Sequence, residues 1–265
     1  MNIYLKELKS HRKSIIFWSI GVFLMVVSGM TKYDAYSTSG QSMTDLLADL
    51  PKSLRAVFGF SDFDLTKASG FYGMLFLYLL LMATIHAAML GATIIAKEER
   101  DKTSEFLFVK PVSRNKIITA KLLAAFTNIV IFNLATFVSS IVILGRYSDG
   151  EAVNGEITIL MAAMFFMQVL FMVIGSALAA IKKRPKSAAS LATGILLLTY
   201  ILSVVIDLNE DIEGLKYLTP FKYFEAKNVM YGGGFEAVFV ILSVVLIAGL
   251  SIVTYVFFRR RDLNT

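Results

Sequence analysis

Residues 157–181 read ITILMAAMFFMQVLFMVIGSALAAI, an apolar stretch that contains no charged side chain. A helix needs about 20 mostly apolar residues to cross the hydrocarbon core of a bilayer, so this stretch is long enough to span a membrane. Its apolar residues are continuous and do not alternate with polar ones, which favours a helix over a strand of a membrane barrel. The stretch therefore predicts a transmembrane helix.

Five other stretches have the same character. The six predicted spans are 14–30, 71–96, 117–144, 157–181, 187–206 and 235–258. Of the 265 residues, 56% are hydrophobic and 17% are charged, whereas soluble globular chains carry about 25% charged residues. This composition excludes a soluble enzyme and a disordered chain. We expect an all-α integral membrane protein that forms a single transmembrane domain over residues 1–265.

The positive charges are distributed unequally between the loops. Of the 26 Lys and Arg residues, 18 lie on the side that holds both termini, the loop after the second span and the loop after the fourth. The positive-inside rule therefore predicts that both termini are cytoplasmic. Basic side chains at this edge attract anionic lipid head groups. Nucleic-acid binding is disfavoured, because no basic patch stands apart from the membrane edge.

Short amphipathic helices are expected outside the spans. Residues 2–13 alternate apolar and basic positions, which predicts an interfacial helix on the cytoplasmic side. The outer loops 31–70 and 207–234 contain capping and turn signals, and their helices either pack over the span ends or form a gate. The residues expected to begin or end these outer helices are Ser42, Asp45, Pro51, Gly59, Thr219, Pro220 and Gly232.

The segment between the second and third spans reads KEERDKTSEFLFVKPVSRNKI over residues 97–117. A mixed-charge run is followed by a short apolar patch, and Ser113 is placed to cap a helix that enters the third span. An amphipathic helix just outside a membrane suits docking into a groove of another protein. The alternative is a solvated interfacial loop.

This segment resembles the corresponding segment of permease subunits of type-2 ATP-binding-cassette exporters. The resemblance rests on the runs 98–100 and 111–114 and on Thr103, Glu105, Ile117 and Lys121, and the order of spans and long outer loops is also similar. It implies an intracellular coupling helix that contacts a separate ATPase subunit. The coupling residues would then be Glu98, Glu99, Arg100, Thr103, Glu105, Phe106, Pro111, Ser113 and Arg114.

The resemblance also implies a dimer, formed with a second copy or with a related permease. In the family, spans one and five of the two subunits meet at the dimer axis. Ser190 and Gly194 lie in the fifth span at the four-residue spacing that permits close helix contact, so they are the expected dimer-contact residues.

Several kinds of site are not predicted. No glycine is followed by lysine, so the phosphate-binding loop G-x-x-x-x-G-K-[ST] is absent and ATP hydrolysis is expected in a partner. The chain has no cysteine and two histidines, and a metal site needs several ligands. No catalytic, cofactor or metal residue is therefore assigned. His86 in the second span is either a packed side chain or a proton relay.

These observations predict the membrane subunit of an exporter in the plasma membrane, energised by a separate ATPase. The absence of charge within the spans favours an apolar or amphipathic cargo such as a peptide, a lipid-like molecule or an antibiotic. Two alternatives come from other classes of protein. One is a non-transporting membrane sensor or immunity protein whose outer loops bind a ligand, and the other is an intramembrane enzyme that uses His86.

Overall fold

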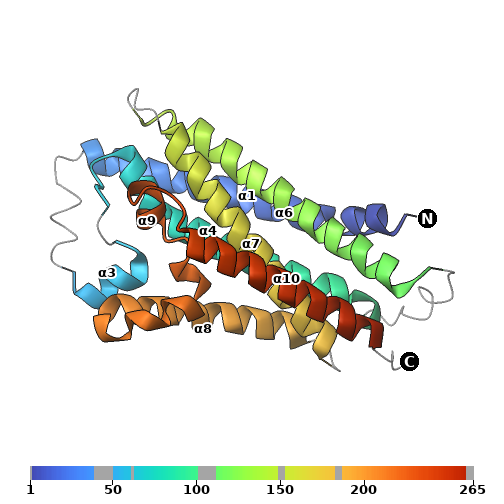
Figure 1. Ribbon diagram of the computed structural model, residues 1–265. Helices are drawn as coiled ribbons and strands as arrows, with labels where there is room; N and C mark the ends of the chain where they lie inside the picture. Colours follow the sequence, from blue (N-terminus) through green and yellow to red (C-terminus); the bar gives the residue numbers. More distant parts are fainter. Residues whose placement is uncertain are drawn as a thin grey trace.

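The fold is a bundle of six long helices (Figure 1). The computed structural model describes residues 2–38, 50–60, 63–100, 112–148, 153–182 and 187–260. Each long helix is long and apolar enough to cross a membrane, which confirms the predicted all-α membrane fold. The long helices are α1 (Ile3–Thr38), α4 (Ala68–Arg100), α6 (Arg114–Leu144), α7 (Asn154–Ile181), α8 (Ala188–Leu208) and α10 (Ala237–Arg260).

Helices α4 and α7 form the centre of the bundle. They are the two most buried spans, with α1 and α6 packed on one side, α8 against both, and α10 against α7. Glycines allow the two backbones to approach closely. A Cβ atom at Gly91 would lie 2.0 Å from the carbonyl oxygen of Met172, and one at Gly175 would lie 2.2 Å from that of Ala88.

The N-terminal segment differs from the prediction of a separate interfacial helix. Residues 2–13 lead directly into the first span, because α1 is one continuous helix from Ile3 to Thr38. No glycine or proline interrupts residues 3–20, so nothing in this sequence favours a break. The amphipathic pattern is still expressed, since Tyr4 and Leu8 pack against the core while Lys6 and Lys9 are exposed.

Short helices cover the end of the bundle that lies away from the two termini (Figure 1). They are α3 (Lys52–Phe58), the 3₁₀ helices η2 (Glu210–Leu218) and η3 (Pro220–Lys222), and α9 (Ala226–Tyr231). Gly59 ends α3 in the left-handed conformation with φ 69°, and Gly232 caps α9. Thr219 is the N-cap of η3 and Pro220 its first residue. Pro51 is the N-cap of α3. The predicted capping box at Ser42 and Asp45 lies outside the described residues.

Hydrogen bonds fix these outer elements to the spans. The Tyr200 hydroxyl donates to the Val57 carbonyl at 2.5 Å, and the Thr219 hydroxyl donates to the Thr199 carbonyl at 2.7 Å. Just before α4, Thr66 donates to the Asp64 carboxylate through its hydroxyl and its N–H. These bonds stabilise the ionised carboxylate, so the pKa of Asp64 lies below its usual value.

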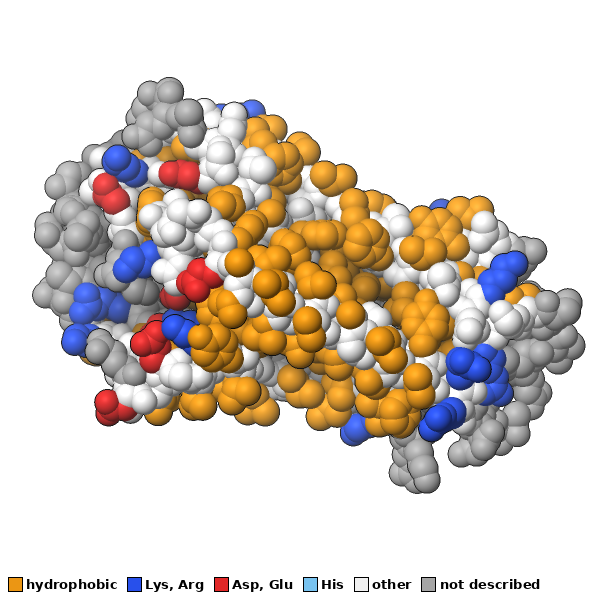
Figure 2. Space-filling view, viewed as in Figure 1, with side chains coloured by type: hydrophobic (Ala, Val, Ile, Leu, Met, Phe, Trp, Pro, Cys, Tyr) orange, Lys and Arg blue, Asp and Glu red, His pale blue; other side chains and the backbone are white. Residues whose placement is uncertain are grey.

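Figure 2 shows how side-chain types are distributed along the bundle. Hydrophobic side chains cover its middle on this face. Strongly exposed apolar residues of the spans include Phe17 of α1 at 76% and Leu198 of α8 at 67%. At the end that carries the termini, this face shows Lys and Arg but no Asp or Glu among the described residues. Both signs of charge occur at the other end. An apolar band between two polar ends is the surface that a bilayer requires.

Candidate functional site

The end of the bundle that carries both termini holds the sequence-predicted coupling residues that the structure describes (Figure 1). Glu98, Glu99 and Arg100 form the last turn of α4, and the Glu99 side chain is half-buried. The structure therefore extends the second span by one helical turn into the predicted coupling segment. Four predicted coupling residues lie outside the described residues: Thr103, Glu105, Phe106 and Pro111.

Ser113 and Arg114 stand where the chain re-enters the bundle. Ser113 is the N-cap of α6, as predicted, and its hydroxyl accepts a hydrogen bond from the Lys116 N–H at 3.3 Å. The Arg114 guanidinium donates to the carbonyl of Arg259 at 2.7 Å. A cation at this place is favourable, because the C-terminal end of α10 carries partial negative charge. Arg114 therefore joins the start of α6 to the end of α10.

A buried group of charged residues lies between α1, the end of α4 and the start of α6, and the sequence did not predict it. Glu7 of α1 is only 2% exposed, and its Oε2 lies 3.0 Å from the Nζ of Lys97 in α4. The Nζ of Lys121 in α6 is 3.9 Å from Glu7 Oε1, and the Lys121 side chain is fully buried. We call Glu7, Lys97 and Lys121 the Glu7 junction. No sequence motif marks these three residues; the local signal is that Glu7 follows the apolar Ile3 by four residues on one helix face.

Two further contacts strengthen this region. Lys121 Nζ also donates to the carbonyl of Ile94 at 2.5 Å, and Lys97 Nζ donates to the Ser10 hydroxyl at 2.9 Å. Lys121 therefore lies against the C-terminal part of α4, where positive charge is favoured, and Lys97 belongs to that part of α4 itself. His11 Nε2 is 3.9 Å from Glu7 Oε2. The arrangement joins three spans through charged side chains that are withdrawn from solvent.

His86 lies in the middle of the bundle and is packed between aromatic rings. Its ring stacks on Phe132 at a centroid distance of 5.0 Å and lies 5.2 Å from the indole of Trp18. This packing supports the reading of His86 as a core residue and gives no support to an intramembrane enzyme. Within the described part of the chain, no group of three His, Cys, Asp or Glu residues could hold a metal ion.

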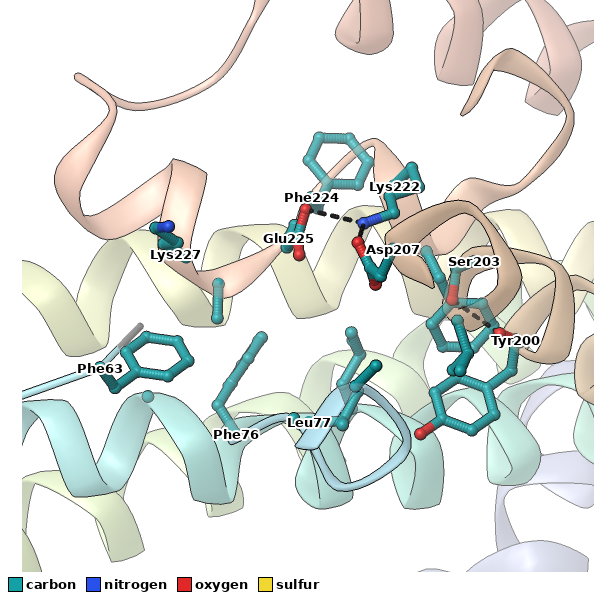
Figure 3. Close-up of a pocket in the computed structure, with 17 residues that line it drawn as sticks. Phe63, Phe76, Leu77, Tyr200, Ser203, Asp207, Lys222, Phe224, Glu225 and Lys227 are labelled. Carbon is teal, nitrogen blue, oxygen red and sulfur yellow. Dashed lines mark hydrogen bonds and ion pairs between the residues drawn. The ribbon is translucent and has the colours of Figure 1, made fainter. Parts of the chain in front are cut away.

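A pocket opens at the opposite end, between α3, α4, α8, η3 and α9 (Figure 3). The empty space in and around it is about 630 Å³, part of which is open solvent. Aromatic and aliphatic side chains make up most of its walls, among them Phe76, Leu77 and Phe224. Such walls, with a few convergent polar groups, are typical of sites for small amphipathic molecules.

One end of this pocket is charged. Lys222 forms an ion pair with Asp207 of α8 and a second one with Glu225, whose Oε2 lies 3.2 Å from its Nζ. Figure 3 shows the three side chains converging at one side of the cavity. Lys227 lines another part of the wall. The pocket thus presents charges of both signs beside an apolar wall, and the sequence alone did not indicate that these distant residues meet.

The predicted dimer-contact residues lie on an open face of α8. Ser190 is exposed, and no described atom outside the neighbouring helix backbone lies within 4 Å of the place that a Cβ of Gly194 would occupy. Leu198 and Ile201 are exposed close to the same line of the helix. The structure contains one chain, so this face is available to lipid or to a second subunit.

Comparison with known proteins gives one family. A family model described as "ABC-2 family transporter protein" matches residues 1–263. A comparison with curated proteins gave no match. The family match covers all six long helices and both candidate regions, which are the end of α4 with the start of α6 and the pocket at the opposite end.

Proposed function

Because the chain belongs to the ABC-2 family of transporter proteins, we propose that it is the membrane subunit of an ATP-driven exporter. The family match to residues 1–263 is the observation that carries this proposal, and the bundle of six apolar helices is consistent with it. The chain is a multi-pass membrane protein, and we place it in the plasma membrane. In this proposal, a separate ATPase subunit binds and hydrolyses ATP.

We place the ATPase at the end of the bundle that carries the termini. The last turn of α4 and the start of α6 lie at this end, and they contain the described residues at the two ends of the predicted coupling segment. The excess of Lys and Arg at this end supports a cytoplasmic location. Force from the ATPase would act on α4 and α6 and change the relative stability of two arrangements of the spans.

The cargo in this proposal is apolar or amphipathic. The central part of each span carries no charged side chain, so a route along the spans offers little to a strongly charged molecule. The pocket at the opposite end combines apolar walls with Asp207, Lys222 and Glu225, which suits a molecule with both an apolar and a polar part. The open face of α8 at Ser190 and Gly194 is the proposed contact with a second permease subunit.

Purification of the full-length protein from its native membrane in mild detergent tests the proposal directly. We expect a soluble ATPase that carries a phosphate-binding loop to co-purify in a fixed ratio, because this chain lacks that loop. Peptide sequencing of every stoichiometric partner is the measurement. Absence of an ATPase, under conditions in which a dimer survives, would contradict the exporter and favour the membrane sensor.

Cysteine labelling tests the orientation. The chain has no cysteine, so a single introduced cysteine can be labelled without background. We expect Lys9→Cys in α1 to react with an impermeant maleimide only after cells are permeabilised, and Glu213→Cys in η2 to react in intact cells. Both positions are exposed. The reverse pattern would show that the termini face outward.

A further inference from the structure

The Glu7 junction joins three spans at the end of the bundle that carries the termini. A buried carboxylate and a fully buried lysine are unusual, because charged side chains lose hydration when they leave water. The cost is offset here by close partners: Glu7 Oε2 lies 3.0 Å from Lys97 Nζ, and Glu7 Oε1 lies 3.9 Å from Lys121 Nζ. Each partner comes from a different span.

The geometry favours a single arrangement of these three helices. An ion pair withdrawn from water is stable only while its geometry is maintained, because separation leaves uncompensated buried charge. Movement of α1 away from α4 or α6 would therefore expose Glu7 without its lysine partners. By contrast, apolar contacts alone would tolerate sliding at smaller cost, since dispersion and burial are not directional.

The junction lies directly beside the predicted coupling segment. Lys97 precedes Glu98 in the last part of α4, and Lys121 lies seven positions after Arg114 in α6. Further along, the Tyr33 hydroxyl donates to the carbonyl of Thr66, just before α4, at 3.0 Å. The Tyr33 ring also lies 5.5 Å from the ring of Phe71 at the start of α4. Between these two contacts α1 is continuous, so it can act as a rod attached to α4 near both of its ends.

We propose that the Glu7 junction makes the N-terminal segment of α1 and the adjoining ends of α4 and α6 move as one body, so that Glu7 carries a displacement of the α4 end into the first span. Glu7 is a positioning residue in this role and does not touch cargo or ATP. The rigid connection is independent of transport. Its use for transmitting force rests on the proposed function.

The first test uses this chain alone in lipid nanodiscs. Spin labels are placed on Lys9→Cys in α1 and Met89→Cys in α4, which are both exposed, and their distance distribution is measured by pulsed electron resonance. The test variant combines Glu7→Leu, Lys97→Met and Lys121→Met, which removes the charges of the junction together and keeps the bulk of the side chains. The control variant combines Lys6→Met and Lys13→Met on the exposed face of α1.

We expect a narrow distribution in the parent and in the control, and one about twofold wider in the triple variant, because α1 is then free to shift against α4. Equal widths in all three would overturn the rigid connection. If the triple variant does not fold, Lys97→Met alone replaces it, since Glu7 then keeps Lys121 as a partner. We expect the distance distribution of that variant to widen as well, but less than that of the triple variant.

The second test uses the complex with the co-purified ATPase. Labels at the far ends of α1 and α8, on Lys32→Cys and Leu208→Cys, report whether ATP with vanadate changes the spacing of the spans. We expect a change in the parent and in the control but none in the triple variant. A retained change in the triple variant would overturn the transmitting role of Glu7. If the parent itself shows no change, the ATP-driven function fails, while the nanodisc result still decides the rigid connection.

Discussion

Gly91→Ala is expected to lower the free energy of unfolding by about 3 kcal/mol, the upper part of the range for overpacked cores. The added Cβ would lie 2.0 Å from the carbonyl oxygen of Met172, which is part of the α7 backbone. No change of rotamer can relieve a contact with backbone, so α4 and α7 would have to separate. Gly175→Ala should have a similar effect, because its Cβ would lie 2.2 Å from the Ala88 carbonyl oxygen.

The midpoint of thermal unfolding, followed by size-exclusion chromatography in one detergent, measures this effect. Gly249→Ala in α10 is the matched control, because its Cβ would meet no described atom within 4 Å outside the neighbouring backbone of its helix. We expect the control to unfold at or above the temperature of the parent, because alanine favours a helix more than glycine does. Equal midpoints for Gly91→Ala and Gly249→Ala would mean that α4 and α7 are further apart than the structure places them.

Charge reversal in the coupling segment is expected to have the largest effect on function. Glu98→Lys and Glu105→Lys should each weaken binding of the ATPase subunit about tenfold or more, because a like charge placed across an interface costs several kcal/mol. Glu98 lies in the last turn of α4, and Glu105 lies outside the described residues. The affinity of the purified permease for its ATPase, measured at low and at physiological salt, is the readout.

A matched reversal at the other end separates this effect from general damage. Glu236→Lys changes an exposed acidic residue just before α10, at the end of that helix away from the C-terminus (Figure 1). We expect this variant to bind the ATPase as the parent does. If Glu98→Lys and Glu105→Lys also bind it normally and remain folded, residues 97–116 are not the contact with the ATPase, and a different part of the cytoplasmic surface must supply it.

Much of the fold was predictable because the decisive signals are local. Continuous apolar stretches indicated the six spans, Gly59 ends α3 because only a residue without a side chain adopts φ 69° easily, and Thr219 with Pro220 begins η3. The interfacial helix at residues 2–13 was expected as a separate element, but the sequence contains no residue that would separate it from the span. Amphipathicity indicated which face is buried without indicating where the helix ends.

The candidate sites were less predictable, because they depend on contacts between distant segments. Asp207, Lys222 and Phe76 come from three parts of the chain and meet only when the outer elements fold over α4 and α8. Arg114 was assigned to a partner protein, yet its side chain also holds the Arg259 carbonyl within the same chain. Glu7 belongs to no sequence motif. Its burial depends on Lys97 of α4 and Lys121 of α6, which lie beside it only in the folded bundle.

The Glu7 junction also has a consequence for the order in which the protein is built. Glu7 is synthesised before both of its lysine partners, since Lys97 follows it by 90 positions in the chain and Lys121 follows later still. Until these lysines are synthesised, the charge of Glu7 has to stay hydrated at the edge of the bilayer. The packing of the first span against α4 and α6 at this end is therefore completed only after all three helices have been synthesised.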